Sequence, residues 1–331
     1  MSAGQRDTAV RAWLRERFGD RFGDRLGRQR AADAPVPRIA VVTDSAAALP
    51  PDWVATLPAG GVLTVMAMPV QIGAEIFSEG DVELDTAIAL ALAAGTPVTT
   101  SRPSPGQFER AYANAAAHGF AAVVSLHISG TLSGTVEAAR MAAGKSPIPV
   151  HVVDTRTAGM AQGFAVQDAV AAALAGGELD GVSDAVEATL ERTRILFYVP
   201  SLDQLRRGGR IGAAASWLGT VFAIKPILAV RDGVVVPLEK VRTAPKAIAR
   251  LEELVLADLA GLAGVATARL CVHHFGNEAQ AQAVADHLQA SSGAIASVTL
   301  SRLPAVLAAH AGLGVLGVVI STRSSTAGTG A

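Results

Sequence analysis

From residue 38 onward, short apolar runs alternate with polar loops and with segments of helical periodicity. Several of these runs have the length and flanking turn residues of buried strands. The predicted strands of the first half are Ile39–Val42, Val62–Val70, Pro97–Thr100, Ala121–Leu126 and Val150–Val153. The predicted helices are Phe108–Ala117, a helix from about Leu132, and Ala158–Ala175. This alternation predicts a parallel sheet with helices packed on it.

The order of elements changes after Gly181. Arg231-Asp232-Gly233 separates two apolar runs and is a hairpin signal, so antiparallel neighbours are expected there. The predicted strands are Ile195–Val199, Ile224–Val230, Val234–Val241, Arg269–His274, Ser297–Leu303 and Val315–Ser321. The predicted helices are a short one capped by Ser201, one from Thr243 to about Leu259, and Asn277–Gln289. These elements predict a second α/β unit with a mixed sheet.

We therefore predict an α/β fold of two domains, with an N-terminal parallel-sheet, Rossmann-like domain at 37–185 and a C-terminal mixed-sheet domain at 186–323. Residues 1–36 form an extension with eight arginines and a linker, and 324–331 form a tail. Phe18, Phe22 and Leu26 would share one face of a helix, but the three glycines within residues 17–27 each cost such a helix about 1 kcal/mol. Two interpretations of residues 1–36 stay open: a mobile or loosely docked extension, and a helix that binds a partner or a membrane surface.

Composition narrows the function classes. Half of the 331 residues are hydrophobic and 17% are charged, which excludes global disorder. A net charge of −1 and 4% aromatic residues argue against nucleic-acid binding. Cys271 is the one cysteine and sits in an apolar run, so a buried, unreactive thiol is expected. Without an apolar signal core near the start or a spanning segment, we expect a cytoplasmic protein with at most transient membrane-surface contact.

Two strand-to-helix corners carry the candidate chemistry. Thr99–Gly106 and Ser125–Thr135 each place hydroxyls and backbone N–H groups where a strand ends and a helix begins. Such corners hold anions, because the first N–H groups of a helix are unpaired and its dipole is positive there. The absence of lysine from both corners favours a small anion, such as one carboxylate, over a polyphosphate. Ser104, Pro105 and Gln107 also form a capping signature for the first of these helices.

Other motifs do not survive inspection of their context. Gly312–Gly317 matches a dinucleotide-binding pattern but lies at the C-terminus before a strand, with no room for the rest of that unit. Gly144-Lys145-Ser146 ends a helix instead of opening one. No histidine set has metal-ligand spacing, and no G-x-S-x-G elbow is present. Asp44 and Asp154 stand at strand ends, where we expect them to organise loops through Asx turns.

Seven segments, in order along the chain, resemble the markers of one family. They are Val42–Ser45, Thr100–Pro105, Ser129–Thr135, Val153–Ala158, Leu205–Gly212, Ile224–Leu228 with Lys240–Thr243, and His310–Gly314. Over Ile39 to Ser321 the chain resembles the DegV family, bacterial fatty-acid-binding proteins that include the FakB subunits of fatty acid kinase.

The resemblance implies a two-domain protein that encloses one long-chain fatty acid and uses no cofactor. The acyl tail would lie in an apolar tunnel within the N-terminal domain, and the carboxylate near the interdomain cleft. Carried over by position, the carboxylate-binding residues are Thr100, Ser129, Gly130 and His310. Further candidate contacts to the head group or a partner are Ser101, Arg102, Thr131, Arg207 and Arg210. A His310 that donates to the carboxylate would be partly protonated near neutral pH.

The same resemblance implies a role in phospholipid metabolism, in which a separate ATP-dependent kinase subunit converts the presented carboxylate to an acyl phosphate. This chain departs from the family pattern at four positions. Arg102 replaces a glutamine, Gly130 a serine, Ala311 a threonine and Leu313 a proline. Arg102 adds a charge that can support anion binding or enlarge the preferred head group, whereas Gly130 keeps its N–H but removes a hydroxyl.

Two further function classes remain open from the sequence. A serine-dependent acyl hydrolase or transferase would use Ser129 or Ser45 as nucleophile, with His310 or His127 as base. A regulatory or scaffolding protein would keep its lipid as a structural element and bind a partner through the Arg-rich extension. A monomer is the default expectation.

Overall fold

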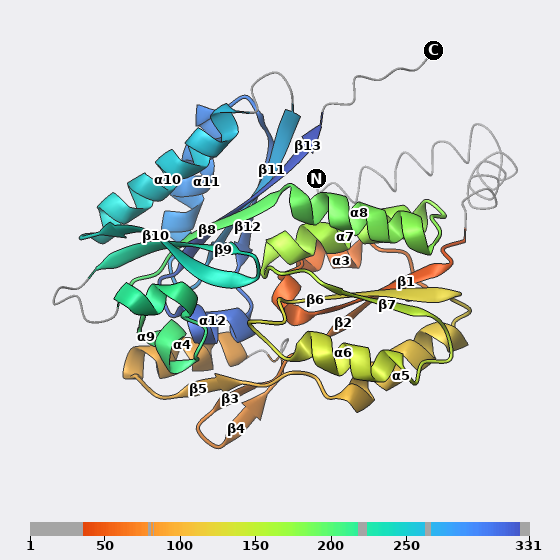
Figure 1. Cartoon of the computed structure of the whole chain (residues 1–331). Coiled ribbons are helices and arrows are strands. Elements are labelled where there is room, and N and C mark those ends of the chain that lie inside the picture. The colour runs from red at the N-terminus through yellow and green to blue at the C-terminus, as the bar shows by residue number, and fades with distance from the viewer. Residues whose placement is uncertain (1–35, 79–80, 82, 218–223, 262–265, 325–331) are drawn as a thin grey trace, which may run out of the picture.

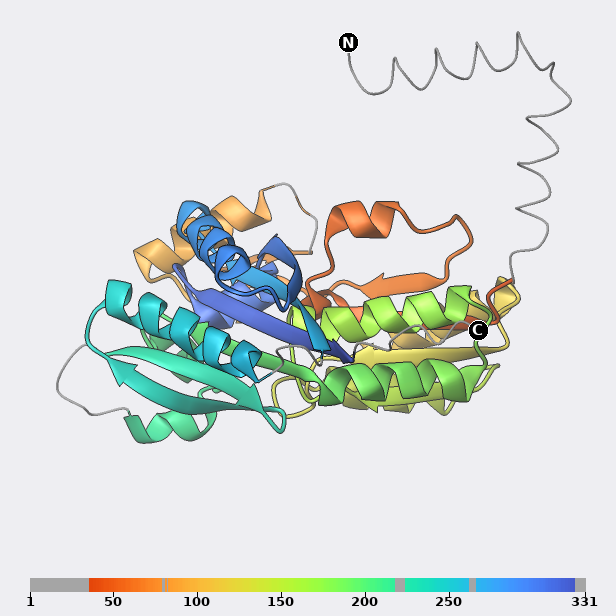
Figure 2. The ribbon, with the colours of Figure 1, turned by 90° about the horizontal axis from the view of Figure 1, so that it is seen from above.

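The computed structural model describes residues 36–78, 81, 83–217, 224–261 and 266–324. The arginine-rich extension and the tail predicted at the two ends fall almost entirely outside these residues. Within them the chain forms two α/β domains side by side, each built on its own sheet (Figures 1 and 2). The predicted fold class is confirmed.

The N-terminal domain is built on a parallel sheet with strand order β2-β1-β6-β7. The strands are β1 (Ile39–Asp44), β2 (Leu63–Met66), β6 (Ala122–His127) and β7 (Val150–Asp154). β1 and β6 are buried along their whole length because helices cover both faces of the sheet. In Figure 1, α5 (Pro105–Ala117) and α6 (Thr135–Ala143) lie on one face, and α7 (Met160–Leu174) and α8 (Leu179–Glu191) on the other.

One predicted strand, Val62–Val70, is wrong as a single element. The structure breaks it into β2 and β3 (Val70–Ile72), which belong to different sheets. Pro69 stands between them, and proline cannot donate a ladder hydrogen bond. The strand predicted near Thr100 also lies outside the parallel sheet: β5 (Val98–Thr100) joins β3 and β4 (Glu75–Phe77) in a small antiparallel sheet.

Short helical elements complete this part of the chain. They are the 3₁₀ turn η1 (Ser45–Ala47), α3 (Pro51–Ala55) and α4 (Leu84–Ala94). The predicted cap of α5 is confirmed, since Ser104 and Gln107 form a reciprocal capping box. Both Asx turns are present as well: Asp44 accepts from the N–H of Ala46, and Asp154 from that of Arg156.

The C-terminal domain has the predicted mixed sheet. Its strand order is β10-β9-β8-β13-β11-β12. Its strands are β8 (Thr193–Tyr198), β9 (Lys225–Arg231), β10 (Val234–Val241), β11 (Ala266–His274), β12 (Ile295–Arg302) and β13 (Leu316–Ser324). Only the β11–β12 pairing is parallel among the described strands of this sheet. The β9–β10 turn has φ of +51° at Asp232 and +85° at Gly233, the geometry that the hairpin signal requires.

The two faces of this sheet have different neighbours. α10 (Ala244–Ala260) and α11 (Glu278–Ser291) pack on one face, against Leu196, Tyr198 and other residues of alternating register. The opposite face meets α12 (Ala305–Ala311), α9 (Asp203–Arg207), the 3₁₀ turn η2 (Gly212–Trp217) and the N-terminal domain. Because strand side chains alternate, Ile195 and Phe197 point toward that second face.

The domains join through packed side chains and ion pairs. The chain crosses between α8 and β8, a few residues after the predicted boundary at 185. Ala48, Met160, Ala161 and Phe164 of the N-terminal domain pack with Cys271 and Val319 of the other. Asp168 of α7 accepts hydrogen bonds from Arg269 and Arg323, and Figure 2 shows β13 ending beside the N-terminal domain. Cys271 is buried, as expected.

Candidate functional site

A cavity of about 260 Å³ lies where the two domains meet. The N-terminal domain supplies the end of β5, the loops that follow β5 and β6, Met68, and the residues just before α7. The C-terminal domain supplies the free face of its sheet together with α9 and α12. Most of the wall is apolar and comes from this second domain, including Ile195, Phe197, Leu205, Val306 and Leu307.

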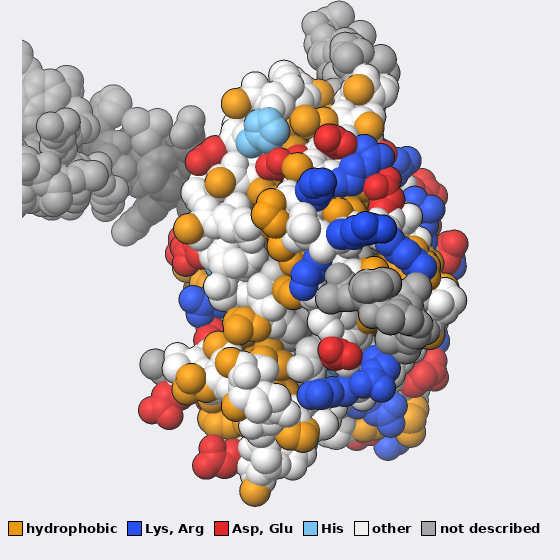
Figure 3. Space-filling model, turned by 90° about the vertical axis from the view of Figure 1, so that its left-hand side faces the viewer, with side chains coloured by type: hydrophobic (Ala, Val, Ile, Leu, Met, Phe, Trp, Pro, Cys, Tyr) orange, Lys and Arg blue, Asp and Glu red, His pale blue; other side chains and the backbone are white. Residues whose placement is uncertain are grey.

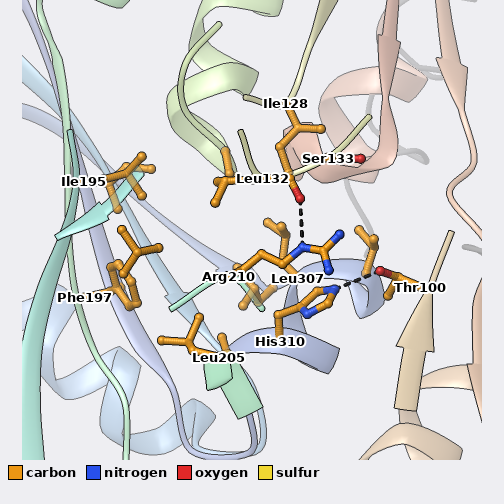
Figure 4. A pocket seen from close by; sticks show the side chains of 18 of the residues that line it. Thr100, Ile128, Leu132, Ser133, Ile195, Phe197, Leu205, Arg210, Leu307 and His310 are labelled. Atoms are coloured by element: carbon orange, nitrogen blue, oxygen red, sulfur yellow. Dashed lines mark hydrogen bonds between the residues drawn. The ribbon is translucent and has the colours of Figure 1, made fainter. Parts of the chain in front are cut away.

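The polar residues labelled in Figure 4, Thr100, Ser133, Arg210 and His310, lie toward one side of the cavity. There Thr100 Oγ1 lies 2.8 Å from His310 Nε2, and the Arg210 guanidinium points toward the same pair. Ser101 and Arg102, which are exposed, continue the lining beyond Thr100 and mark where the cavity reaches the surface. Ile195 and Phe197 lie at the other side in the same view. The cavity is therefore amphipathic along its length.

Local structure explains how this polar end forms. Thr100 is the last residue of β5, and His310 is in the last turn of α12. Arg210 follows the Gly208-Gly209 turn after α9 and donates from Nε to the carbonyl of Leu132 at 2.9 Å. Gly208 is required beside His310, because a Cβ at position 208 would lie 2.2 Å from His310 Nδ1.

His310 is neutral at physiological pH. Burial lowers the pKa of its imidazole to about 4, and the positive charge of Arg210 acts in the same direction. The partial protonation expected near neutral pH applies to a His310 that donates to a carboxylate. A bound carboxylate would act in the opposite direction and raise this pKa.

A second histidine, His273, lies on the wall away from the Thr100–His310 pair. Its Nε2 accepts from the N–H of Met160 at 3.0 Å, and its Nδ1 lies 3.3 Å from the carbonyl oxygen of Ser301. Burial lowers the pKa of His273 to about 4. Both ring nitrogens of His273 therefore have backbone partners.

Comparison with known proteins shows to which family this chain belongs. The profile of a family described as uncharacterised protein, DegV family, matches residues 38–323. The chain belongs to the DegV family. A DegV domain-containing protein of Streptomyces coelicolor is 45% identical over 285 residues, which cover 86% of this chain and 99% of that protein. One from Mycobacterium tuberculosis is 40% identical over 228 residues, covering 69% and 80% respectively.

Solved DegV structures share the fold. One from Thermus thermophilus, described as showing fatty acid binding of a DegV family protein, has a TM-score of 0.79 and 32% identity. It is covered over 100% of its length by 86% of this chain. DegV of Bacillus subtilis, described as a fatty acid binding protein, has a TM-score of 0.76 and 29% identity, with 86% of this chain covering 99% of it. Both of these DegV-family proteins are thus described as binding fatty acids.

The DegV resemblance named residues that the structure divides into two groups. Thr100, Ser101, Arg102, Arg210 and His310 all line the cavity. Arg207 does not line it; this residue is exposed in the last turn of α9. The remaining three residues, at positions 129–131, also lie off the cavity.

The 129–131 segment turns toward the β9–β10 hairpin instead. Ser129 Oγ donates to the carbonyl of Gly233 at 2.8 Å, and Thr131 Oγ1 donates to the same oxygen. The N–H of Gly130 donates to Asp154 Oδ1 at 3.1 Å. The donors predicted to hold a carboxylate therefore have protein partners here, and Ser133 and Gly134 occupy the cavity wall in their place.

The expected tail tunnel within the N-terminal domain is not what this cavity forms. The core of that domain is filled by packed side chains of its sheet and helices. The cavity walls come mainly from positions 195–319, on the sheet face left uncovered by α10 and α11. Strand alternation predicts that Ile195 and Phe197 share one face of the sheet. Which of the two faces helices leave uncovered depends on long-range packing, which the sequence does not show.

The structure also contains a buried Ser–His–Asp chain. His127 Nδ1 lies 2.9 Å from Asp44 Oδ2, and His127 Nε2 lies 2.7 Å from Ser125 Oγ. All three residues belong to β1 or β6 and are completely buried, and Ser125 is hydrogen-bonded to Tyr112 as well. The hydrolase pairs considered from the sequence are not assembled, since Ser129 bonds to Gly233, Ser45 accepts from Met68, and His310 pairs with Thr100.

Two features are absent from the part of the chain that the structure describes. No cluster of His, Cys, Asp or Glu there could hold a metal ion. No helix there is both long and apolar enough to cross a membrane.

Proposed function

We propose that this DegV protein is a non-catalytic carrier of one long-chain fatty acid. The observation that carries the proposal is the amphipathic cavity, with an apolar body and a polar end formed by Thr100, Arg210 and His310. The fatty acid binding described for the Thermus thermophilus and Bacillus subtilis proteins supports it.

In this proposal the tail lies against the free face of the C-terminal sheet, beside residues such as Phe197 and Val306. Each buried methylene contributes about 0.8 kcal/mol, so the tail supplies most of the affinity. The carboxylate accepts hydrogen bonds from Thr100, His310 and Arg210. Such charge-assisted bonds are worth about 1.5–3 kcal/mol each and orient the ligand with its head group toward the surface.

We further propose that the head group is presented to a separate ATP-dependent fatty acid kinase. In that reaction a carboxylate oxygen attacks the γ-phosphorus of ATP, which yields an acyl phosphate and ADP. The exposed position of Ser101 and Arg102 beside the cavity supports access from outside. Figure 3 shows Lys and Arg side chains gathered on the side of the molecule that lies at the left of Figure 1, and such a surface suits an acidic partner. Arg207 is exposed in α9.

Native mass spectrometry of the purified protein, followed by lipid extraction, tests the carrier proposal. One adduct of fatty-acid mass at near-full occupancy is expected. Thr100→Val keeps the side-chain shape but removes the hydroxyl bonded to His310, and should lower occupancy after exchange with excess palmitate. Thr99→Val is the matched control, because Thr99 is exposed and lies outside the cavity lining. A wild-type protein that stays free of lipid and refuses palmitate and oleate would overturn the proposal.

The kinase step has its own test. A fatty acid kinase catalytic subunit, ATP and the lipid-loaded protein are mixed, and acyl phosphate is trapped with hydroxylamine as the hydroxamate. Product is expected only when all three are present. Hydroxamate formed without the kinase subunit would contradict the non-catalytic assignment, and none formed with it would remove the kinase partnership while leaving the carrier role intact.

A further inference from the structure

Two arginines donate hydrogen bonds to the same short loop beside the polar residues of the cavity. Arg210 donates to the carbonyl of Leu132 at 2.9 Å, and Arg102 donates from Nη1 to the carbonyl of Gly134 at 3.3 Å. Both carbonyls belong to the loop that leads into α6, and both guanidiniums line the cavity. The arginines come from different domains, so the loop is held from two sides.

The charge of these two arginines is not neutralised by the surrounding protein. Among the described residues, no Asp or Glu lies within 4.0 Å of either guanidinium. A guanidinium has five N–H donors, and within that part of the chain Arg102 uses one of them on a protein acceptor. The neighbouring His310 is neutral at physiological pH, because burial lowers its pKa to about 4. The positive charge at this end therefore comes from arginine.

We propose that Arg102 determines the selectivity of the site for anionic over neutral lipids. This inference rests on the proposed function, since it concerns the head group of the carried lipid. Arg102 is exposed and lines the cavity, so its remaining donors are available to the head group of a bound lipid. A planar guanidinium matches the two oxygens of a carboxylate, whereas an alcohol or ester offers no charge for it.

Gly134 fixes the position of this guanidinium. A Cβ at residue 134 would lie 2.2 Å from Arg102 Nη1 and 3.2 Å from its Cδ and Cζ. The backbone of Gly134, with φ of −74° and ψ of 15°, is accessible to alanine. Gly134→Ala therefore displaces the arginine without removing its charge, which separates the effect of position from the effect of charge.

The experiment compares the affinity of the purified, delipidated protein for myristate and for tetradecanol, which share one chain length. Wild-type protein should prefer myristate. Arg102→Gln should lower myristate affinity by about 10-fold to 100-fold, the effect of one charge-assisted hydrogen bond, and leave tetradecanol affinity within about 2-fold. Arg102→Lys, which keeps the charge but not the fork, should lie between the two. Arg110→Gln, an exposed arginine outside the cavity, is the matched control and should change neither affinity.

Gly134→Ala should reproduce the loss for myristate, and combining it with Arg102→Gln should add nothing, because both changes remove one contact. Equal losses for myristate and tetradecanol in Arg102→Gln would show that Arg102 is only part of the wall, and unchanged myristate affinity would show that it does not contact the head group. Either result overturns the inference while the carrier role stands. A wild-type protein that binds neither lipid would instead refute the proposed function.

Discussion

Replacing Gly208 with alanine should disconnect His310 from Thr100 while leaving the fold intact. Gly208 has φ of −75° and ψ of −10°, a conformation that alanine adopts freely. Alanine at such a position stabilises a protein by about 0.4–1 kcal/mol, because it restricts the unfolded chain. Its Cβ, however, would lie 2.2 Å from His310 Nδ1 and 2.9 Å from Cε1. Since unstrained contacts begin at about 3.5 Å, the ring must move by roughly 1 Å or more.

The size of the effect follows from the geometry. A movement of this size breaks the 2.8 Å contact between Thr100 Oγ1 and His310 Nε2, which costs about 0.5–1.5 kcal/mol in the free protein. The gain from alanine offsets most of that loss, so the free energy of unfolding should stay within about 1 kcal/mol of wild type. Fatty acid affinity should fall about 10-fold to 100-fold, because a charge-assisted bond to the carboxylate is lost as well.

Urea unfolding, calorimetric titration with myristate and NMR of the histidine rings together measure these outcomes. Gly181→Ala is the matched control, since Gly181 lies within α8 and a Cβ there meets nothing within 4 Å. It should stabilise the protein by up to about 1 kcal/mol and leave myristate affinity unchanged. A Gly208→Ala protein with wild-type affinity and an unmoved His310 resonance would refute the reasoning.

Two further predictions concern stability. Burial lowers the pKa of His273 and His310 to about 4, so between pH 6.5 and 4 the unfolded chain binds more protons than the folded one. The unfolding free energy of the lipid-free protein should therefore drop by several kcal/mol from pH 7 to 4.5 in urea titrations, and His310→Gln should make that drop smaller; an unchanged pH profile would contradict this. Asp168→Asn leaves the Arg269 guanidinium, whose side chain is 12% exposed, without its carboxylate and should cost about 3–5 kcal/mol in the same assay. Glu178→Gln, which removes one partner of an exposed ion pair, should cost less than about 1 kcal/mol, and equal losses would disprove the buried-pair argument.

Local signals in the sequence predicted local structure well. The hairpin at Asp232-Gly233 and the capping box of Ser104 with Gln107 each depend on residues a few positions apart, so their chemistry is readable without the fold. The strand-helix alternation likewise predicted the parallel sheet and the mixed sheet. Val62–Val70 failed because continuous apolarity concealed a break at Pro69, after which the chain enters a different sheet.

The direction of the loop after β6 could not be read from the sequence. Ser129 and Ser133 lie in the same hydroxyl-rich segment, and nothing in the local sequence indicates which of them lines the cavity. The β9–β10 hairpin decides, because the carbonyl of Gly233, about a hundred positions away, accepts from Ser129. The apolar wall was missed for a similar reason, since Phe197 alternates with core positions and only the packing of α10 and α11 leaves its face open.

The shared interface between the domains has a consequence for lipid exchange. A hinge motion wide enough to separate the domains would expose Phe164, Cys271 and Val319 to water. It would also break the hydrogen bonds that Asp168 accepts from Arg269 and Arg323. Each of these losses costs free energy, so the two domains should move as one rigid body on the timescale of lipid exchange. Entry and release of a ligand would then depend on small displacements of the rim beside Ser101 and Arg102, and the off-rate would report the stiffness of that rim.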